Sequence, residues 1–141
     1  MSPAVSKPKS EVPVADLSEK SLQTLGKAFW ALAGHYNLTR VEQALVLGFN
    51  KVNRQRLASL EEKKMIPDDP DKAYRVGILL GIHKNLRIIY PHNRDIVYAW
   101  LKTERDLFQG KTALEFVAAG TDTLPRLFTI RRILDQVRCE L

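Results

Sequence analysis

The sequence DPDKAYRVGILLGIHKNLRIIYP, residues 69–91, decides the fold expected for this chain. Asp69 directly before Pro70 is typical of a helix start, because the carboxylate caps free backbone N–H groups and proline fits the first turn. Pro91 closes the stretch, since proline cannot continue a helix. Between them apolar residues recur at helical spacing, at Ala73, Val76, Leu79, Leu80, Ile82, Leu86, Ile89 and Tyr90. The stretch therefore predicts one long helix.

Three shorter helices are expected before it. An apolar stripe predicts the first, capped by Asp16 with Glu19 and ending at Gly34 or Asn37; the stripe consists of Leu22, Leu25, Phe29, Leu32 and Tyr36. The second begins at a capping box made by Thr39 and Glu42 and runs to a break at residues 48–50. Asn50 is then expected to cap a third helix from Lys51 to about Glu62, with an inner side formed by Val52, Leu57 and Leu60.

Three more helices are expected after Pro91. Asn93 can cap one that carries Ile96, Val97, Trp100 and Leu101. Thr112 and Glu115 form a second capping box, after a turn at residues 109–110, and Gly120 closes that short helix. The last helix begins near Leu124 and carries Leu127, Ile130, Leu134 and Val137. No stretch shows the sustained alternation of a strand, so the predicted fold class is all-α.

Composition sets wider bounds. The chain has 141 residues, a net charge of +6 and 45% hydrophobic residues, which fits one domain or two small ones. A single cysteine, Cys139, excludes an internal disulfide framework and a cysteine-built zinc site. No apolar run is long enough to span a bilayer, and the N-terminus lacks a signal-peptide pattern. A cytoplasmic protein without a membrane contact is expected.

The organisation along the chain follows from the same patterns. Residues 1–15 hold three prolines and little apolar surface, and we expect a flexible tail there. The boundary between the two halves falls at the Pro-Asp-Asp-Pro run of residues 67–70. The predicted divisions are thus 1–15, 16–66 and 67–141.

Nothing in the sequence indicates catalysis. The three histidines, His35, His83 and His92, lack the spacing of a metal site, and Cys139 lies outside any recognisable nucleophile motif. Gly77 and Gly81 stand four residues apart, which favours close helix packing over phosphate binding. We expect no catalytic residues, no cofactor and no metal.

Residues 39–62 have the order of a helix-turn-helix: a short capped helix, a break and a second helix. The second helix opens with residues able to contact bases or phosphates: Asn50, Lys51, Asn53, Arg54, Gln55 and Arg56. An ordinary helical hairpin with a solvated basic face explains the pattern about as well. The sequence leaves both interpretations open.

The last helix is rich in arginine, with Arg126, Arg131, Arg132 and Arg138. Cations near a helix C-terminus are favourable to its dipole, and Arg131 can pair with Asp135 one turn on. The functional alternative is an exposed arginine-bearing end that enters a pocket of a partner.

Three segments resemble a known family when taken in order. Residues 75–91 are similar to the long central helix of bacterial Xre/MbcA/ParS-type antitoxins. Trp100 with Leu101, followed by residues 108–115, resembles the toxin-binding segment of that family, and residues 129–135 resemble its terminal helix. The likeness covers roughly residues 71–141, and the helix-turn-helix candidate precedes it where the family carries an Xre-like DNA-binding part.

The resemblance implies an antitoxin of a type II toxin–antitoxin pair. Its partner would be a RES-domain toxin that consumes NAD⁺, and the antitoxin would block the toxin pocket while the complex represses its own operon. Residues 16–66 would be the Xre-like domain and 67–141 a helical toxin-binding bundle, in a homodimer. The expected toxin-binding residues are Trp100, Phe108, Gly110, Lys111, Thr112, Arg131, Arg132, Arg138 and Leu141. The alternative is a free-standing helix-turn-helix regulator, or a helical dimerisation module without a toxin.

Overall fold

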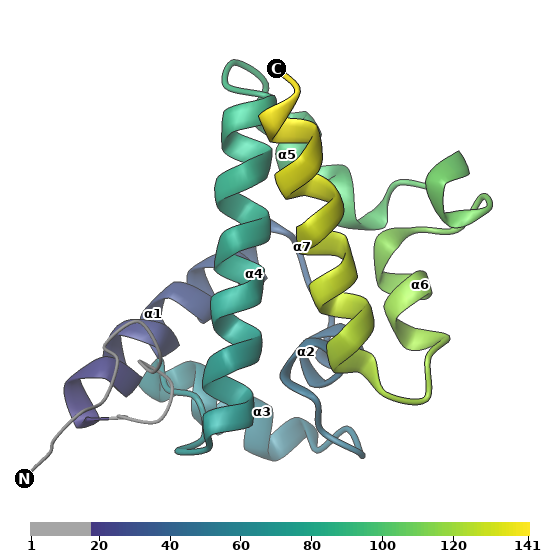
Figure 1. The fold of residues 1–141 in the computed structure, drawn as a ribbon. Helices are drawn as coiled ribbons and strands as arrows, with labels where there is room; N and C mark the ends of the chain where they lie inside the picture. Colours follow the sequence, from purple (N-terminus) through teal and green to yellow (C-terminus); the bar gives the residue numbers. More distant parts are fainter. Residues whose placement is uncertain (1–17) are drawn as a thin grey trace, which may run out of the picture.

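The computed structural model describes residues 18–141, and within that range the regular structure is helical (Figure 1). The predicted all-α class is confirmed there. Residues 105 and 111 form one isolated antiparallel bridge. The helices are α1 (Glu19–His35), α2 (Arg40–Leu47), α3 (Arg54–Lys63), α4 (Pro70–Ile89), α5 (Arg94–Ala99), α6 (Ala113–Ala118) and α7 (Thr123–Cys139), with 3-10 turns η3 (Trp100–Lys102) and η4 (Asp106–Phe108). The predicted tail, residues 1–15, and the predicted cap Asp16 lie outside the described residues.

Two long helices, α4 and α7, run side by side in the same direction and form the centre of the fold (Figure 1). Side-chain hydrogen bonds join them at two levels: Arg75 bonds to Thr123, and Asn85 bonds to Asp135 about three turns further on. Helices α1 and α2 pack on α4, while α6 packs on α7. The C-terminal ends of both long helices therefore lie at the same end of the molecule.

Most helix starts follow the local signals. Thr39 and Thr112 each form the expected capping box, and the side chains of Asp69 and Asn93 accept from the first turns of α4 and α5. The first helix differs slightly, because Ser18 accepts from the backbone of Ser21 and caps it. The caps satisfy backbone donors that a helix start leaves free, and each typically stabilises a helix by ~1 kcal/mol.

The predicted start of the third helix is wrong. Asn53, not Asn50, caps α3, since its side chain accepts from the backbone N–H of Arg56. Lys51 and Val52 belong to the preceding loop, and Val52 is 40% exposed instead of facing the core. Leu57 is fully buried as expected.

Two other boundaries differ from the expectation. Trp100 and Leu101 lie in η3 instead of continuing α5. Helix α6 ends at Ala118 with Ala119 as its C-cap, so Gly120 does not close it directly. Such one- or two-residue differences at helix ends are common, because terminal turns tighten or fray.

One cluster of buried apolar side chains extends through the described residues. It includes Phe29 of α1, Leu47 of α2, Ile82 of α4 and Leu127 of α7, so residues on both sides of the predicted boundary at 66–67 contribute to it. Within residues 18–141, no helix combines the length and the apolar character that a membrane crossing requires.

Candidate partner-binding surfaces

The six candidate DNA-contacting residues are all exposed. Asn50, Lys51 and Asn53 lie on the loop before α3, whereas Arg54, Gln55 and Arg56 form its first turn. No acidic residue occurs from position 48 to position 60, and α3 has none in its first turn. The structure thus gathers cations at a helix N-terminus, where backbone N–H groups also favour anions.

Phe49 anchors this basic loop. The guanidinium of Arg56 lies 4.9 Å from the centre of the Phe49 ring, and the ammonium of Lys72 lies 5.3 Å from it. Lys72 also donates to the backbone oxygen of Gly48 at 3.3 Å. Lys72 of α4 was not among the predicted residues, because it comes from another helix and only the fold brings it here.

Arg75 joins the same loop to both long helices. Its side chain is buried, donates to Asp71 at 3.0 Å and to the hydroxyl of Thr123 at 2.7 Å, and lies 3.9 Å from Asp122. Partial burial acts to raise the pKa of Asp71, but hydrogen bonds and charge from Lys72 and Arg75 outweigh it and lower that pKa. Arg75 is thus a paired, structural cation that links the starts of α4 and α7.

Trp100 and Phe108 of the predicted toxin-binding set are core residues. Their rings meet edge to face with centres 6.3 Å apart, and Phe108 also packs on Phe116 at 5.0 Å. Arg105 covers the Trp100 ring at 4.4 Å. These aromatics therefore hold the segment against the bundle instead of offering a free surface.

Three further members of the predicted toxin-binding set, Gly110, Lys111 and Thr112, lie at or directly after a tight turn that follows η4. Gln109 and Gly110 both have positive φ, and Gly110 and Lys111 are exposed. Thr112 is engaged as the N-cap of α6. Gly110 and Lys111 are thus the members of this segment that the described structure leaves accessible.

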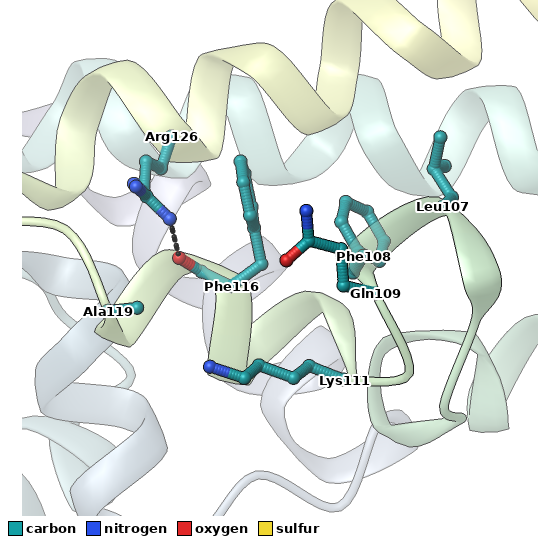
Figure 2. Close-up of a pocket in the computed structure, with 7 residues that line it drawn as sticks. All are labelled: Leu107, Phe108, Gln109, Lys111, Phe116, Ala119 and Arg126. Atoms are coloured by element: carbon teal, nitrogen blue, oxygen red, sulfur yellow. Dashed lines mark hydrogen bonds between the residues drawn. The ribbon is translucent and has the colours of Figure 1, made fainter.

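A pocket of ≈ 240 Å³ opens beside this turn, and Figure 2 shows the side chains around it. The Phe116 ring stands between Arg126 on one side and Phe108 on the other. Arg126 donates to the backbone oxygen of Phe116 at 2.8 Å, and its guanidinium lies 4.6 Å from the ring centre. The full lining is Leu107, Phe108, Gln109, Lys111, Phe116, Ala119 and Arg126. Sequence reasoning missed Phe116 and Arg126 as site residues.

The C-terminal half of α7 carries the remaining predicted residues. Arg132 is exposed, Arg138 is half-buried and Leu141 is 76% exposed. Arg131 differs, because its side chain lies across Gly81 of α4 and its Nε is 4.0 Å from Asp135. Leu134 is the last buried side chain, so residues 135–141 present only exposed or half-buried groups.

The two glycines of α4 have different surroundings. A Cβ atom at Gly81 would lie 2.5 Å from Nε of Arg131, so a side chain there would require the end of that arginine to move. Nothing lies within 4 Å of such an atom at Gly77. Gly77 therefore has no packing role, and Gly81 makes room for the side chain of Arg131.

His83 belongs to a stack of rings between α1, α4 and α5. Tyr98 lies between His35 at 4.8 Å and His83 at 6.4 Å, with nearly parallel planes, and the Tyr36 hydroxyl lies 2.9 Å from Nδ1 of His83. Burial, followed by the charges of Arg87 and His35, lowers the pKa of His83. His83 is thus a neutral, hydrogen-bonded packing residue.

Within residues 18–141, no cluster of three or more histidine, cysteine, aspartate or glutamate side chains could hold a metal ion. Comparisons with protein-family models, curated proteins and solved structures find no match to this chain.

Proposed function

We propose that this chain is the antitoxin of a type II toxin–antitoxin pair and that it binds a RES-domain, NAD⁺-consuming toxin through residues 71–141. The proposal rests on the resemblance of that region to Xre/MbcA/ParS-type antitoxins. The observation that carries it is the end of α7, where residues 135–141 have no buried side chain. Val137, Arg138 and Leu141 there combine apolar and cationic surface, which is the composition that protein interfaces favour.

Inhibition of this kind needs occlusion and no chemistry. Helix α7 packs against α4, and its last buried side chain is Leu134, so the exposed end continues a helix that the core holds in place. Arg132 can donate to carboxylates or carbonyl oxygens of the partner through a planar fork of N–H groups. Leu141 adds apolar contact area beside it.

A co-purification experiment tests this function. The chain is co-expressed with the product of the neighbouring gene, which the proposal requires to be a RES-domain protein, and the complex is followed by size-exclusion chromatography and calorimetry. We expect one stable complex, weakened at least tenfold by the pair Arg132→Glu and Leu141→Asp. Lys27→Glu, an exposed change on α1 that reverses one charge as Arg132→Glu does, is the control and should bind normally. Two purified proteins that do not associate would overturn the proposal.

We propose as a second function that the same chain binds operator DNA through residues 50–56. The specific observation is the exposed, acid-free stretch at the start of α3, in which the loop carries Lys51 and the first helical turn carries Arg54 and Arg56. Such residues contact phosphates and base edges when a helix N-terminus enters a major groove.

Fluorescence anisotropy with the DNA upstream of the gene tests this. Replacing Lys51, Arg54 and Arg56 by glutamine should lower affinity and reduce the salt dependence by about 0.9 per lost phosphate contact. The control replaces three exposed lysines elsewhere, Lys20, Lys27 and Lys84, by glutamine. Equal affinity for both triple variants would contradict DNA binding by this loop.

A further inference from the structure

The pocket between η4, α6 and the start of α7 is lined by a cation, Arg126, that has no acidic partner among residues 18–141. The Arg126 guanidinium stacks on Phe116 and donates one N–H to its backbone oxygen. The stem of Arg126 passes over Gly120, where a Cβ atom would come within 2.6 Å of Cδ. Stacking, hydrogen bond and glycine together hold the side chain in one orientation.

The positive charge of the pocket is uncompensated in the described residues. Neither Arg126 nor Lys111 forms an ion pair within residues 18–141, although both line the pocket. Arg75 differs from these two residues, because it is buried and forms an ion pair with Asp71. Arg126 already stacks on Phe116 and donates to one carbonyl oxygen, and its remaining N–H groups can form charge-assisted hydrogen bonds with a carboxylate.

The donors that remain suit a carboxylate better than a phosphate. The backbone N–H groups of Gln109, Gly110 and Lys111 all donate within the turn, to Asp106, Arg105 and Phe108 respectively. Phosphate sites in proteins commonly draw on several free backbone amides, and this turn offers none from those three positions. Two cationic side chains remain, which match the two oxygens of a carboxylate.

Apolar side chains at the edge of the pocket favour a ligand that also has an apolar group. Leu107 is 55% exposed at the edge of the pocket, and the Phe116 ring forms a half-buried wall. A volume of ≈ 240 Å³ accommodates one or two side chains, and it is below the ~300–1,000 Å³ of typical small-molecule sites. The occupant therefore combines an acidic group with a neighbouring apolar side chain.

We infer that this pocket binds an acidic side chain flanked by an apolar residue on a partner protein. The carboxylate lies between Arg126 and Lys111, and the apolar neighbour packs on Leu107 and Phe116. The inference rests on the proposed function only in expecting a protein partner, and its ligand chemistry is tested without a toxin.

The test is an NMR titration of the isolated full chain. The probe is acetyl-Leu-Glu-Leu-amide, with acetyl-Leu-Gln-Leu-amide and inorganic phosphate as comparisons. We expect the glutamate peptide to shift the Nε–H signal of Arg126 and the amides of Gln109 and Lys111 in a saturable way. The glutamine peptide should bind at least fivefold more weakly. Equal binding of both peptides, no saturation, or saturable binding of phosphate at the same site would each overturn the inference.

Two variants localise the effect. Lys111→Glu reverses an exposed charge at the pocket and should abolish the response to the glutamate peptide while the remaining spectrum is unchanged. Lys27→Glu makes the same charge change on α1 and should leave the affinity within twofold. An unchanged affinity in Lys111→Glu would place peptide binding elsewhere and contradict the assignment of this pocket.

Discussion

Arg131 of α7 lies directly across Gly81 of α4, so that a Cβ atom on the glycine would come within 2.5 Å of the arginine Nε. The guanidinium end of Arg131 can lie over α4 at this level because position 81 has no side chain. The contact also distinguishes Arg131 from its neighbour Arg132, which the sequence alone does not. Arg131 is held against α4, whereas Arg132 points into solvent and is free to meet a partner.

The glycine pair on α4 gives the first prediction. Gly77→Ala should stabilise the fold by about 0.5–1 kcal/mol, because alanine has the higher helix propensity and nothing crowds the new methyl group. Gly81→Ala should gain less, since the Arg131 side chain must move aside. Urea denaturation measures both. An equal gain at the two positions would show that Arg131 does not restrict position 81.

The two neighbouring arginines give the second prediction. Arg132→Ala should change the free energy of unfolding by less than ~0.5 kcal/mol, because exposed helix cations contribute little. The same change should weaken binding of the toxin. Arg131→Ala should lower stability more than Arg132→Ala, since it removes packing on Gly81. The reverse order of stabilities in urea melts would contradict the assigned roles.

Gly48 gives the third prediction. Its φ is +78°, and a Cβ atom there would lie 2.5 Å from Nε and Cζ of Arg75. Gly48→Ala should therefore cost the ~1–2 kcal/mol of a left-handed alanine and, in addition, displace Arg75 from its buried partners. Gly110→Ala is the matched control, because φ is +85° there but the space is open. Equal destabilisation of the two variants would show that Arg75 contributes nothing at position 48.

The fourth prediction concerns pH. The pKa of His83 lies below its usual 6.5 in the folded chain, so between the two values the unfolded chain binds more protons. The stability that His83 contributes is therefore complete above pH 6.5 and is lost as the pH falls below it. Urea midpoints should decrease from pH 7.5 to 5.5. His83→Gln should reduce that decrease, and an unchanged pH dependence in this variant would contradict the role of His83.

Local signals in the sequence predict much of the fold. The Asp69–Pro70 start, both capping boxes and the apolar stripe of the long helix each specify structure within a few residues, and the structure has them where expected. The choice between Asn50 and Asn53 as a cap is different, because either side chain can accept from the next turn. Contacts of the loop with Lys72 and Arg75 accompany the later start, and they come from another helix.

The candidate surfaces are less accessible to sequence reasoning. Arg75 shares a helix face with Leu79, Ile82 and Leu86, which signals burial, yet its partner Thr123 lies 48 positions away. Arg126 can likewise be recognised as a pocket residue only from the fold, which stacks its guanidinium on the Phe116 ring. The resemblance to a family motif predicted that Trp100 and Phe108 contact a partner. Both side chains are buried instead, where they pack residues 100–108 against the rest of the fold.

The central proposal is that the end of α7 blocks the NAD⁺ pocket of the toxin. We test it by measuring NAD⁺ consumption by the purified toxin complex. The complex is prepared with the full chain and with a chain lacking residues 137–141. Because the last buried side chain of α7 is Leu134, the deletion should leave the fold intact. We predict that the shortened chain binds the toxin more weakly, because it lacks Arg138 and Leu141, and that it no longer blocks NAD⁺ consumption even at concentrations that keep the complex formed. Full inhibition by both the shortened chain and the Arg132→Ala variant would contradict it.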